Sequence, residues 1–353
     1  MVLLEAKNVV KKFPIKGGFF GRTVGHVHAL NDVSLSIAEG ETVGLVGESG
    51  CGKTTLGRLI MRLMAPTSGQ IIFEGQDLTR WSEGKLRPLR KKFQMIFQDP
   101  YSSLNPRMTV GQILTEPLTV HKINGGKPRR ERVFEMLQKV GLAPEAYEKY
   151  PHEFSGGQRQ RVGIARALML APRLVVADEP VSALDVSIQA QIINLLETLQ
   201  KELNLTYLFI AHDLKVVRHI SKKIVVMYLG HIVEEIPSEN LAQARHPYTH
   251  ALLSAVPVPN PELQREKIVL KGDVPSPIDP PSGCVFRTRC PYAQAICAEQ
   301  VPLLEEITAQ HHAACHFWRE IHSFEKLTIN NFQPISEKIP QPWRSASDTG
   351  GSE

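Results

Sequence analysis

A glycine-rich octapeptide between a short apolar run and a helical pattern constrains the fold of this chain more than any other feature. It reads Gly-Glu-Ser-Gly-Cys-Gly-Lys-Thr over residues 47–54, so two glycines five positions apart are followed by lysine and threonine. The run Thr42–Val46 is typical of a strand buried on both faces, and residues 53–64 have helical periodicity. Glycines allow successive N–H groups to face a phosphate at a helix N-terminus, which favours an anion. The octapeptide therefore predicts a nucleoside triphosphate site.

The residue types of this loop indicate how it would hold the nucleotide. The Lys53 ammonium can reach the β- and γ-phosphates, and the Thr54 hydroxyl can ligate Mg²⁺. The other predicted nucleotide contacts in the loop are Gly47, Ser49, Gly50, Cys51, Gly52 and Thr55. The alternative, a glycine-rich turn that matches by chance, is disfavoured by the strand and the helix on either side.

A pair of carboxylates follows a second apolar strand pattern. Leu174–Ala177 is apolar throughout, which predicts a strand in the core, and Asp178 and Glu179 come directly after it. In an open α/β sheet, the carboxyl end of such a strand lies beside the phosphate loop. We expect Asp178 to hold Mg²⁺ through water and Glu179 to polarise the attacking water as general base. The alternative is that one carboxylate only caps the next turn.

Strands and helices alternate through the middle of the chain, which predicts an α/β fold with a mainly parallel core sheet. Apolar alternation in residues 3–10 and 27–37 predicts an additional antiparallel β layer. Residues 105–165, approximately, have helical periodicity and few β-branched runs, so we predict a helical subdomain there. We therefore predict a nucleotide-binding domain over residues 1–258.

The composition of the chain changes near residue 256. Twelve of the 25 prolines lie at or beyond Pro257, and this density does not fit a continuation of the helix-and-strand core. We therefore predict a small irregular domain, rich in cysteine and proline, over residues 259–322. Residues 323–353 lack periodicity and are predicted to form a flexible tail.

The sequence also bears on the compartment of the protein. Glu5 and Lys7 interrupt any apolar core of a secretory signal peptide, and no apolar run approaches the roughly 20 residues of a membrane-spanning helix. We therefore expect the chain in the cytosol, where its five cysteines are not expected to form structural disulfides. The formal net charge of +5 is too small over 353 residues to indicate nucleic-acid binding.

Five further motifs resemble those of ATP-binding cassette (ABC) ATPases. The segment Phe-Ser-Gly-Gly-Gln-Arg-Gln-Arg over residues 154–161 resembles the signature motif of that family and ends 17 residues before Asp178. The Q-loop glutamine, the D-loop, the switch histidine and the ring that stacks on adenine are matched by Gln98, Ser182–Asp185, His212 and Phe13. The departures are Phe154 in place of leucine and Phe13 in place of tyrosine.

The resemblance implies that ATP binds between two cassettes packed head to tail. Ser155, Gly156, Gly157 and Gln158 would begin a helix whose N–H groups face the γ-phosphate held by the opposite subunit. Asp185 would cross the interface between the two subunits.

The resemblance also implies roles around the γ-phosphate. His212 would contact this phosphate and hold the attacking water in line with Glu179. Gln98 would contact both this water and Mg²⁺, so the implied metal site consists of Thr54, Gln98 and Asp178. ATP and Mg²⁺ are therefore the expected cofactors.

Three segments resemble the peptide and nickel importer branch of the family, namely residues 97–107, 246–253 and 281–291. In that branch, two ATPase subunits, usually different, pair beneath two transmembrane permease subunits. An extracytoplasmic solute-binding protein delivers the solute to these permeases. The resemblance implies an ATPase that energises import of dipeptides or oligopeptides from the cytoplasmic face of the inner (plasma) membrane, with no nucleic-acid partner. Nickel or glutathione import is the first alternative. A soluble cassette ATPase acting on nucleic acid or ribosomes is the second, although this chain lacks the usual coiled coils or second cassette.

Four of the five cysteines, Cys284, Cys290, Cys297 and Cys315, lie within 32 residues of one another. Five, six and seventeen residues separate them, whereas zinc sites commonly have pairs separated by two to four. Four thiolates can instead hold a [4Fe–4S] cluster, and some members of the importer branch carry one at matching cysteines. We expect such a cluster to stabilise a unit with little core. The alternative is four free or oxidisable thiols.

Overall fold

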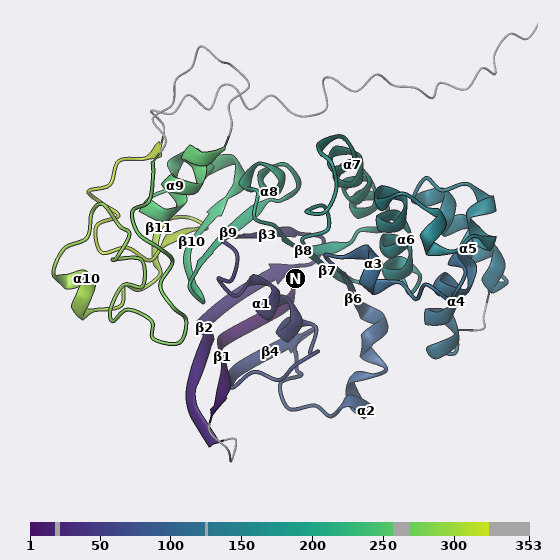
Figure 1. The fold of residues 1–353 in the computed structure, drawn as a ribbon, viewed down its shortest axis with the longest axis horizontal. Coiled ribbons are helices and arrows are strands. Elements are labelled where there is room, and N and C mark those ends of the chain that lie inside the picture. Colours follow the sequence, from purple (N-terminus) through teal and green to yellow (C-terminus); the bar gives the residue numbers. More distant parts are fainter. Residues whose placement is uncertain (18–21, 124–125, 257–267, 325–353) are drawn as a thin grey trace, which may run out of the picture.

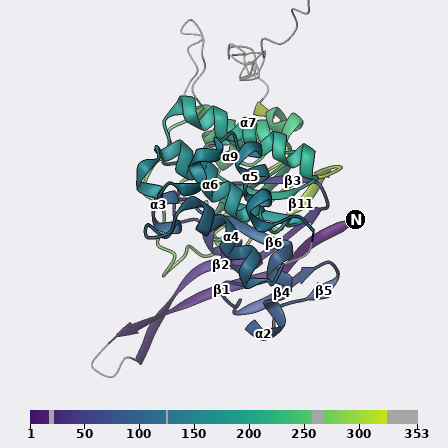
Figure 2. The ribbon, with the colours of Figure 1, turned by 90° about the vertical axis from the view of Figure 1, so that its right-hand side faces the viewer.

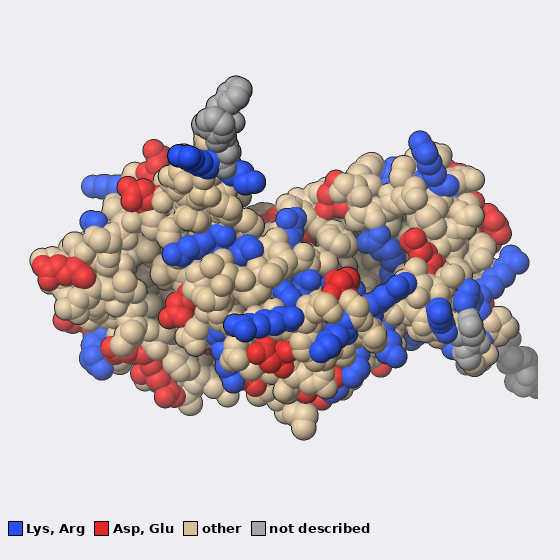
Figure 3. Space-filling model, turned by 90° about the horizontal axis from the view of Figure 1, so that it is seen from below, with Lys and Arg blue, Asp and Glu red and all other residues tan. Residues whose placement is uncertain are grey.

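The computed structural model describes residues 1–17, 22–123, 126–256 and 268–324, which form two β-sheets with helices between and around them (Figure 1). In this part of the chain, no helix is both long and apolar enough to cross a bilayer. On the face shown in Figure 3, acidic and basic side chains are interspersed, so opposite charges partly offset one another there.

Within the described residues, the central sheet has eight strands in the order β11-β12-β10-β9-β3-β8-β7-β6. The strands from β9 to β6 run parallel to one another, which confirms the predicted parallel core. They are Lys223–Tyr228 (β9), Thr42–Val46 (β3), Thr206–Ile210 (β8), Leu174–Asp178 (β7) and Phe93–Ile96 (β6). Every residue of β3, β7 and β8 is buried, because helices or the second sheet cover both faces, and this explains their unbroken apolar runs.

β10 continues this sheet beyond β9, and two strands of the C-terminal part (residues 268–324) extend it further. β10 (His231–Pro237) is antiparallel to β9, β12 (His311–Ala313) pairs with β10, and β11 (Glu305–Thr308) pairs with β12. β11 and β12 lie in the proline-rich region beyond residue 256, so the prediction that this region does not continue the helix-and-strand core was wrong, whereas the domain limits at residues 258 and 322 remain a prediction. Strands of three or four residues contain too few alternations to be recognised in a proline-rich sequence.

The predicted antiparallel layer is present as a second sheet in the order β2-β1-β4-β5. Its strands are Val2–Gly17 (β1), Arg22–Ala38 (β2), Ser68–Phe73 (β4) and Gln76–Asp77 (β5). β1 and β2 are longer than predicted and form a hairpin that projects from the body (Figure 2). The register pairs Phe13 with Val27 within this hairpin.

Helix α1 (Lys53–Ile60) follows β3 and lies between the two sheets (Figure 1). Its apolar side chains Leu56 and Leu59 are fully buried in a core shared with both sheets. The helix is shorter than the predicted range of residues 53–64, and Arg62 beyond it has a left-handed φ of 50°. Burial between the sheets fixes the direction of α1, and therefore the position of the loop at its N-terminus.

Most of the remaining helices lie on the side of the central sheet away from the hairpin (Figure 1). Those of the predicted helical subdomain are Val110–Val120 (α4), Arg129–Lys139 (α5) and Gly156–Leu168 (α6), and its limits remain a prediction. The others are Glu83–Leu86 (α2), Pro100–Ser103 (α3), Val186–Leu203 (α7), Leu214–Ile220 (α8), Pro247–Ala255 (α9) and Ile296–Glu299 (α10). Short 3₁₀ turns occupy Leu89–Lys92, Pro144–Glu148, Pro151–Glu153 and Ser238–Gln243.

The end of the described chain is packed against the body. Phe324 is 5% exposed, and its ring centroid lies 5.3 Å from that of His250 in α9. The flexible tail was predicted to begin at residue 323, so its first residues are an exception to that prediction. The rest of the predicted tail, residues 325–353, lies outside the described residues.

Candidate active site

The glycine-rich loop connects the carboxyl end of β3 to the N-terminus of α1, as predicted. Gly52 has a φ of 106°, which side-chain-bearing residues rarely adopt. A Cβ atom on Gly47 would lie 2.2 Å from the Met227 carbonyl oxygen, so only glycine fits this close approach to β9. These glycines keep the loop compact at the end of the central sheet.

Lys53 lies inside the curve of this loop and is only 4% exposed. Its Nζ donates to the carbonyl oxygens of Gly47 and Glu48 at 2.8 and 3.0 Å. These two bonds orient the ammonium in advance along the concave side of the loop. Cys51, a predicted nucleotide contact, is buried in the core shared by the two sheets, where burial raises the pKa of its thiol.

Asp178 at the end of β7 meets the phosphate loop across the central sheet. The Thr54 hydroxyl donates to Asp178 Oδ1 at 3.0 Å, so the two predicted Mg²⁺ ligands from separate motifs are neighbours. Burial is the main cause that raises the pKa of Asp178, and the adjacent Glu179 carboxylate raises it further. A buried carboxylate beside a hydroxyl is a set of hard oxygen donors, which fits Mg²⁺.

Glu179 is contacted by two other predicted residues. Gln98 Nε2 donates to Glu179 Oε2 at 3.0 Å, and His212 Nδ1 lies 3.5 Å from the same oxygen. Gln98 follows β6 and His212 follows β8, on either side of β7. Because parallel strands end at one edge of the sheet, residues about 30 to 80 positions apart converge on one carboxylate.

A pocket of about 670 Å³ adjoins these groups. The predicted residues in its lining are Phe13, Ser49, Gly50, Gly52, Lys53, Thr54, Thr55, Gln98, Glu179 and His212. Val27 and Ala29 of β2 and Pro277 of the C-terminal part also line it, and sequence reasoning missed all three as site residues. The antiparallel pairing of Phe13 with Val27 could have indicated β2, but nothing in the sequence indicated Pro277.

The predicted signature and D-loop residues are not in the lining of this pocket. Ser155 caps α6, with its hydroxyl accepting from the Gln158 N–H at 3.3 Å, and Asp185 caps α7 by accepting from the Ile188 N–H at 3.0 Å. A Cβ atom on Gly157 would lie 2.5 Å from Ile188, so the first turns of the two helices pack closely. The structure thus brings Ser155, Gly156, Gly157, Gln158 and Asp185 together as a second group.

The four late cysteines are neighbours. The pKa of Cys290 is raised to about 11 and that of Cys315 to about 12, mainly by burial and in smaller part by nearby thiols, which for Cys315 are all three others. In the described part of the chain, however, no group of three or more His, Cys, Asp or Glu side chains is arranged as a metal site. The predicted [4Fe–4S] cluster is therefore not confirmed.

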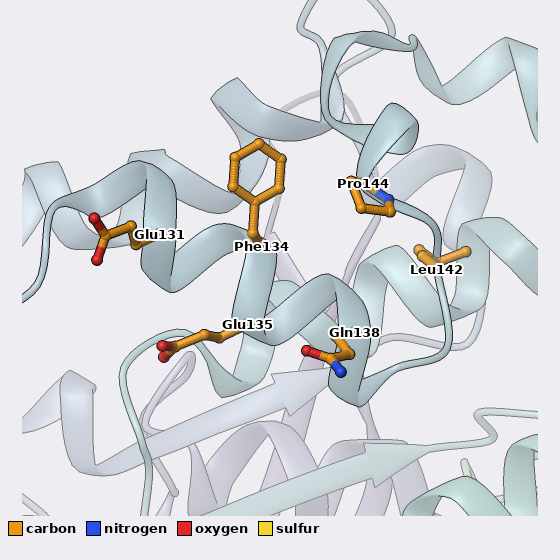
Figure 4. Close-up of a pocket in the computed structure, with 6 residues that line it drawn as sticks. All are labelled: Glu131, Phe134, Glu135, Gln138, Leu142 and Pro144. Atoms are coloured by element: carbon orange, nitrogen blue, oxygen red, sulfur yellow. The ribbon is translucent and has the colours of Figure 1, made fainter. Parts of the chain in front are cut away.

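Another hollow, of about 580 Å³, lies on the helical side of the molecule (Figure 4). Glu131, Phe134, Glu135 and Gln138 of α5 line it, together with Leu142 and Pro144 beyond that helix. None of them is among the predicted site residues, and we assign this hollow no role.

The fold and the ATP site define the class of the protein. A phosphate loop after a central parallel strand, a carboxylate pair after a neighbouring strand, and a capped Ser-Gly-Gly helix identify an ATP-hydrolysing cassette of the P-loop class. Residues 30–182 match the family model described as ABC transporter, and residues 233–297 match the oligopeptide/dipeptide transporter C-terminal region.

Comparison with individual proteins narrows this class. The chain is 57% identical over 320 residues to the oligopeptide transport ATP-binding protein AppF of Bacillus subtilis (strain 168), covering 90% of this chain and 97% of that protein. It is 52% identical over 315 residues to the probable peptide ABC transporter ATP-binding protein y4tS of Sinorhizobium fredii (strain NBRC 101917 / NGR234), with 89% of each covered. The dimeric post-hydrolysis structure of the ATP-binding cassette MJ0796, bound to ADP and Pi, matches with a TM-score of 0.60 and 30% identity over 67% of this chain and 99% of that one. The chain belongs to the oligopeptide/dipeptide family of ABC transporter ATP-binding proteins.

Proposed function

We propose that this chain is the ATP-hydrolysing subunit that energises peptide import through an ABC transporter. The observation that carries the proposal is the contact of Gln98 and His212 with one oxygen of Glu179, beside a pocket that also contains Lys53 and Thr54. The names of the relatives support peptides as the cargo, in preference to nickel or glutathione.

In the proposed reaction, water attacks the γ-phosphorus, the bond to the β–γ bridging oxygen breaks, and ADP and phosphate leave. Glu179 Oε2 accepts the proton of the water, while Gln98 and His212 hold that carboxylate in place. Lys53 neutralises phosphate charge from inside the loop. Mg²⁺, held by Thr54, Asp178 and Gln98, would supply further charge neutralisation.

The second group of predicted residues would complete the site of a companion cassette. Ser155, Gly156 and Gly157 stand at the N-terminus of α6, where backbone N–H groups favour an anion. Asp185 lies close by at the start of α7, where it would cross the interface. The dimeric MJ0796 structure supports such pairing for a similar cassette. We propose a related but different ATPase as the companion.

The proposed complex contains two permease subunits and no nucleic acid. An extracytoplasmic binding protein delivers the peptide to the permeases. The chain would bind them peripherally at the cytoplasmic face of the membrane. Co-purification from detergent extracts tests this composition. Two multi-span permeases are expected, whereas ribosomal or nucleic-acid partners would contradict the proposal.

Substitution of Glu179 by glutamine tests the catalytic assignment. The amide keeps the shape of the side chain but cannot accept the proton, so ATP should still bind while turnover falls by about 10²-fold or more. The exposed Glu239 provides a matched control, because Glu239→Gln makes the same chemical change at a residue that does not line the pocket. Near-normal ATP hydrolysis in the reconstituted Glu179→Gln transporter would remove Glu179 from the role of general base.

We further propose that Cys284, Cys290, Cys297 and Cys315 hold a [4Fe–4S] cluster, which would stabilise this unit or sense redox state. The Cys284 N–H donates to the Cys297 carbonyl at 2.8 Å, and this proximity of two of the cysteines supports the proposal. Iron and sulfide should be present in protein purified anaerobically, and Cys290→Ser should lose them. Cys51→Ser is the control that should retain iron, because Cys51 belongs to the core shared by the two sheets, whereas Cys284 and Cys290 pack against a different core cluster. Colourless, iron-free protein would contradict the proposal.

A further inference from the structure

The phosphate loop receives a charged contact from the C-terminal part of the chain. Arg289 Nη1 lies 2.8 Å from Glu48 Oε2, although 241 positions separate the two residues. Glu48 is the second residue of the glycine-rich octapeptide, directly after Gly47. Side-chain exposure is 10% for Arg289 and 28% for Glu48, so water screens this pair less than it screens a pair on the open surface.

Aromatic rings hold the arginine in this position. The guanidinium carbon lies 6.0 Å from the ring centroid of Tyr228 at the end of β9. Phe286 packs against both Tyr228 and Tyr248, at 5.1 and 5.5 Å between centroids. The Tyr248 hydroxyl also accepts from the Glu48 N–H at 2.8 Å. The C-terminal part and α9 therefore hold both the backbone and the carboxylate of Glu48.

The position of Glu48 bears directly on Lys53. The carbonyl oxygens of Gly47 and Glu48 accept both of the bonds that orient the Lys53 ammonium. A displacement of Glu48 would move these carbonyls and with them the charge that meets the phosphates. The interaction of Arg289 with Glu48 is thus one step removed from the nucleotide.

A second contact from the same region reaches the other end of the pocket. The Pro277 carbonyl accepts from the His28 N–H of β2 at 2.8 Å, and Pro277 lines the pocket together with Phe13 and Val27. The C-terminal part thus touches the pocket both on the phosphate side and on the side of the predicted adenine ring.

We propose that Arg289 is a positioning residue of the ATP site, which holds the phosphate loop through Glu48 in the geometry that binds the triphosphate. This inference rests on the proposed ATPase function and deepens it. Arg289 directly precedes Cys290, so the segment that bears the thiols also bears the contact with the phosphate loop. The residues that contact Glu179 are not part of this interaction, and the effect therefore falls on ATP binding more than on the chemical step.

Steady-state kinetics of the assembled transporter test the inference. Arg289→Ala and Glu48→Gln should each raise the KM for ATP by roughly tenfold, as expected for loss of a charge-assisted hydrogen bond, with kcat changed by less than about twofold. Arg289→Lys should recover part of the affinity. Arg287→Ala is the matched control, because Arg287 lies in the same turn but contacts Ser282. A fall in kcat with an unchanged KM, or wild-type kinetics in Arg289→Ala, would overturn the inference.

Direct binding of a fluorescent ATP analogue to the full chain separates this inference from the proposed function. If the wild-type chain fails to bind the analogue, the proposed function fails together with the inference. If the wild-type chain binds it and Arg289→Ala binds it equally well, only the inference fails. Because Arg289→Ala could unfold the C-terminal part, the double variant Glu48→Arg/Arg289→Glu is also measured. The double variant should bind ATP more tightly than Glu48→Arg or Arg289→Glu alone. If a folded double variant shows no such recovery, the result counts against the ion pair.

Discussion

The ATP site and the cysteine-bearing unit both place their chemistry on loops, but different kinds of structure hold these loops. In the ATP site, the loops leave the ends of β3, β7 and β8, which are buried along their whole length. In the cysteine-bearing unit, individual hydrogen bonds hold the turns, such as the bond from the Cys284 N–H to the Cys297 carbonyl at 2.8 Å. A buried parallel strand is visible in the sequence as an unbroken apolar run, whereas a hydrogen bond between two turns leaves no local pattern.

Lys53→Ala should have the largest effect of the substitutions that bear on this comparison. It removes the ammonium that the loop carbonyls orient toward the phosphates, so both ATP affinity and turnover should fall, turnover by about 10²-fold or more. The measurement is ATP binding together with hydrolysis in the assembled transporter. Lys201→Ala on the exposed side of α7 is the control. If Lys53→Ala retained near-normal turnover, the loop would not be the phosphate site, although its position is the best determined by the sequence.

The predictability of the ATP site follows from this difference. β3 was predicted at both of its observed limits, and β7 was predicted one residue too short, because continuous burial demands an apolar run. Asp178 and Glu179 then followed from their position at the end of such a run. The roles of Ser155 and Asp185 came only from the family resemblance, and the structure adds that each caps a helix.

The features that the sequence did not predict depend on contacts between distant segments or on very short elements. The Arg289–Glu48 pair and the Pro277 contact each join segments more than 200 residues apart, and no local spacing encodes them. The pairing of β12 with β10 was missed for the same reason, since three residues cannot establish an alternation. Phe324 was assigned to the tail because burial of a single ring has no periodicity.

Gly44→Ala is expected to destabilise the whole cassette. Gly44 lies within β3, and a Cβ atom there would be 1.9 Å from Val217 Cγ1 and 2.6 Å from Ser221 Oγ. Helix α8 must move away from the sheet, so the free energy of unfolding should fall by about 1–3 kcal/mol. Thermal unfolding measures this loss. Gly163→Ala in α6 is the matched control, because among the described residues no atom beyond its chain neighbours and the local backbone of α6 lies within 4 Å of the added Cβ, and alanine favours a helix, so stability should not fall.

Gly283→Ala makes the same chemical change in the cysteine-bearing unit, with a smaller expected effect on global stability. Gly283 has a φ of 62°, and a Cβ atom there would lie 2.4 Å from the Cys297 carbonyl oxygen, which accepts from the Cys284 N–H. The strain should open this turn at a cost of about 1 kcal/mol. Because the turn also leads to Arg289, a modest rise in the KM for ATP should accompany it.

Comparison with Gly272→Ala separates the two causes of strain in Gly283→Ala, which are the positive φ and the steric contact of the added Cβ. Gly272 also has a positive φ, of 76°, but no atom lies within 4 Å of its added Cβ, so only the backbone strain is shared. Gly283→Ala should therefore be the more disruptive of the two when ATP affinity and protease sensitivity of the C-terminal part are measured. If it instead lowered the thermal stability of the cassette as much as Gly44→Ala does, the turns of this unit would be as deeply integrated into the cooperative core as β3. The pairing of β12 with β10 provides a route for such integration, so this measurement decides whether the two regions differ in stability as well as in construction.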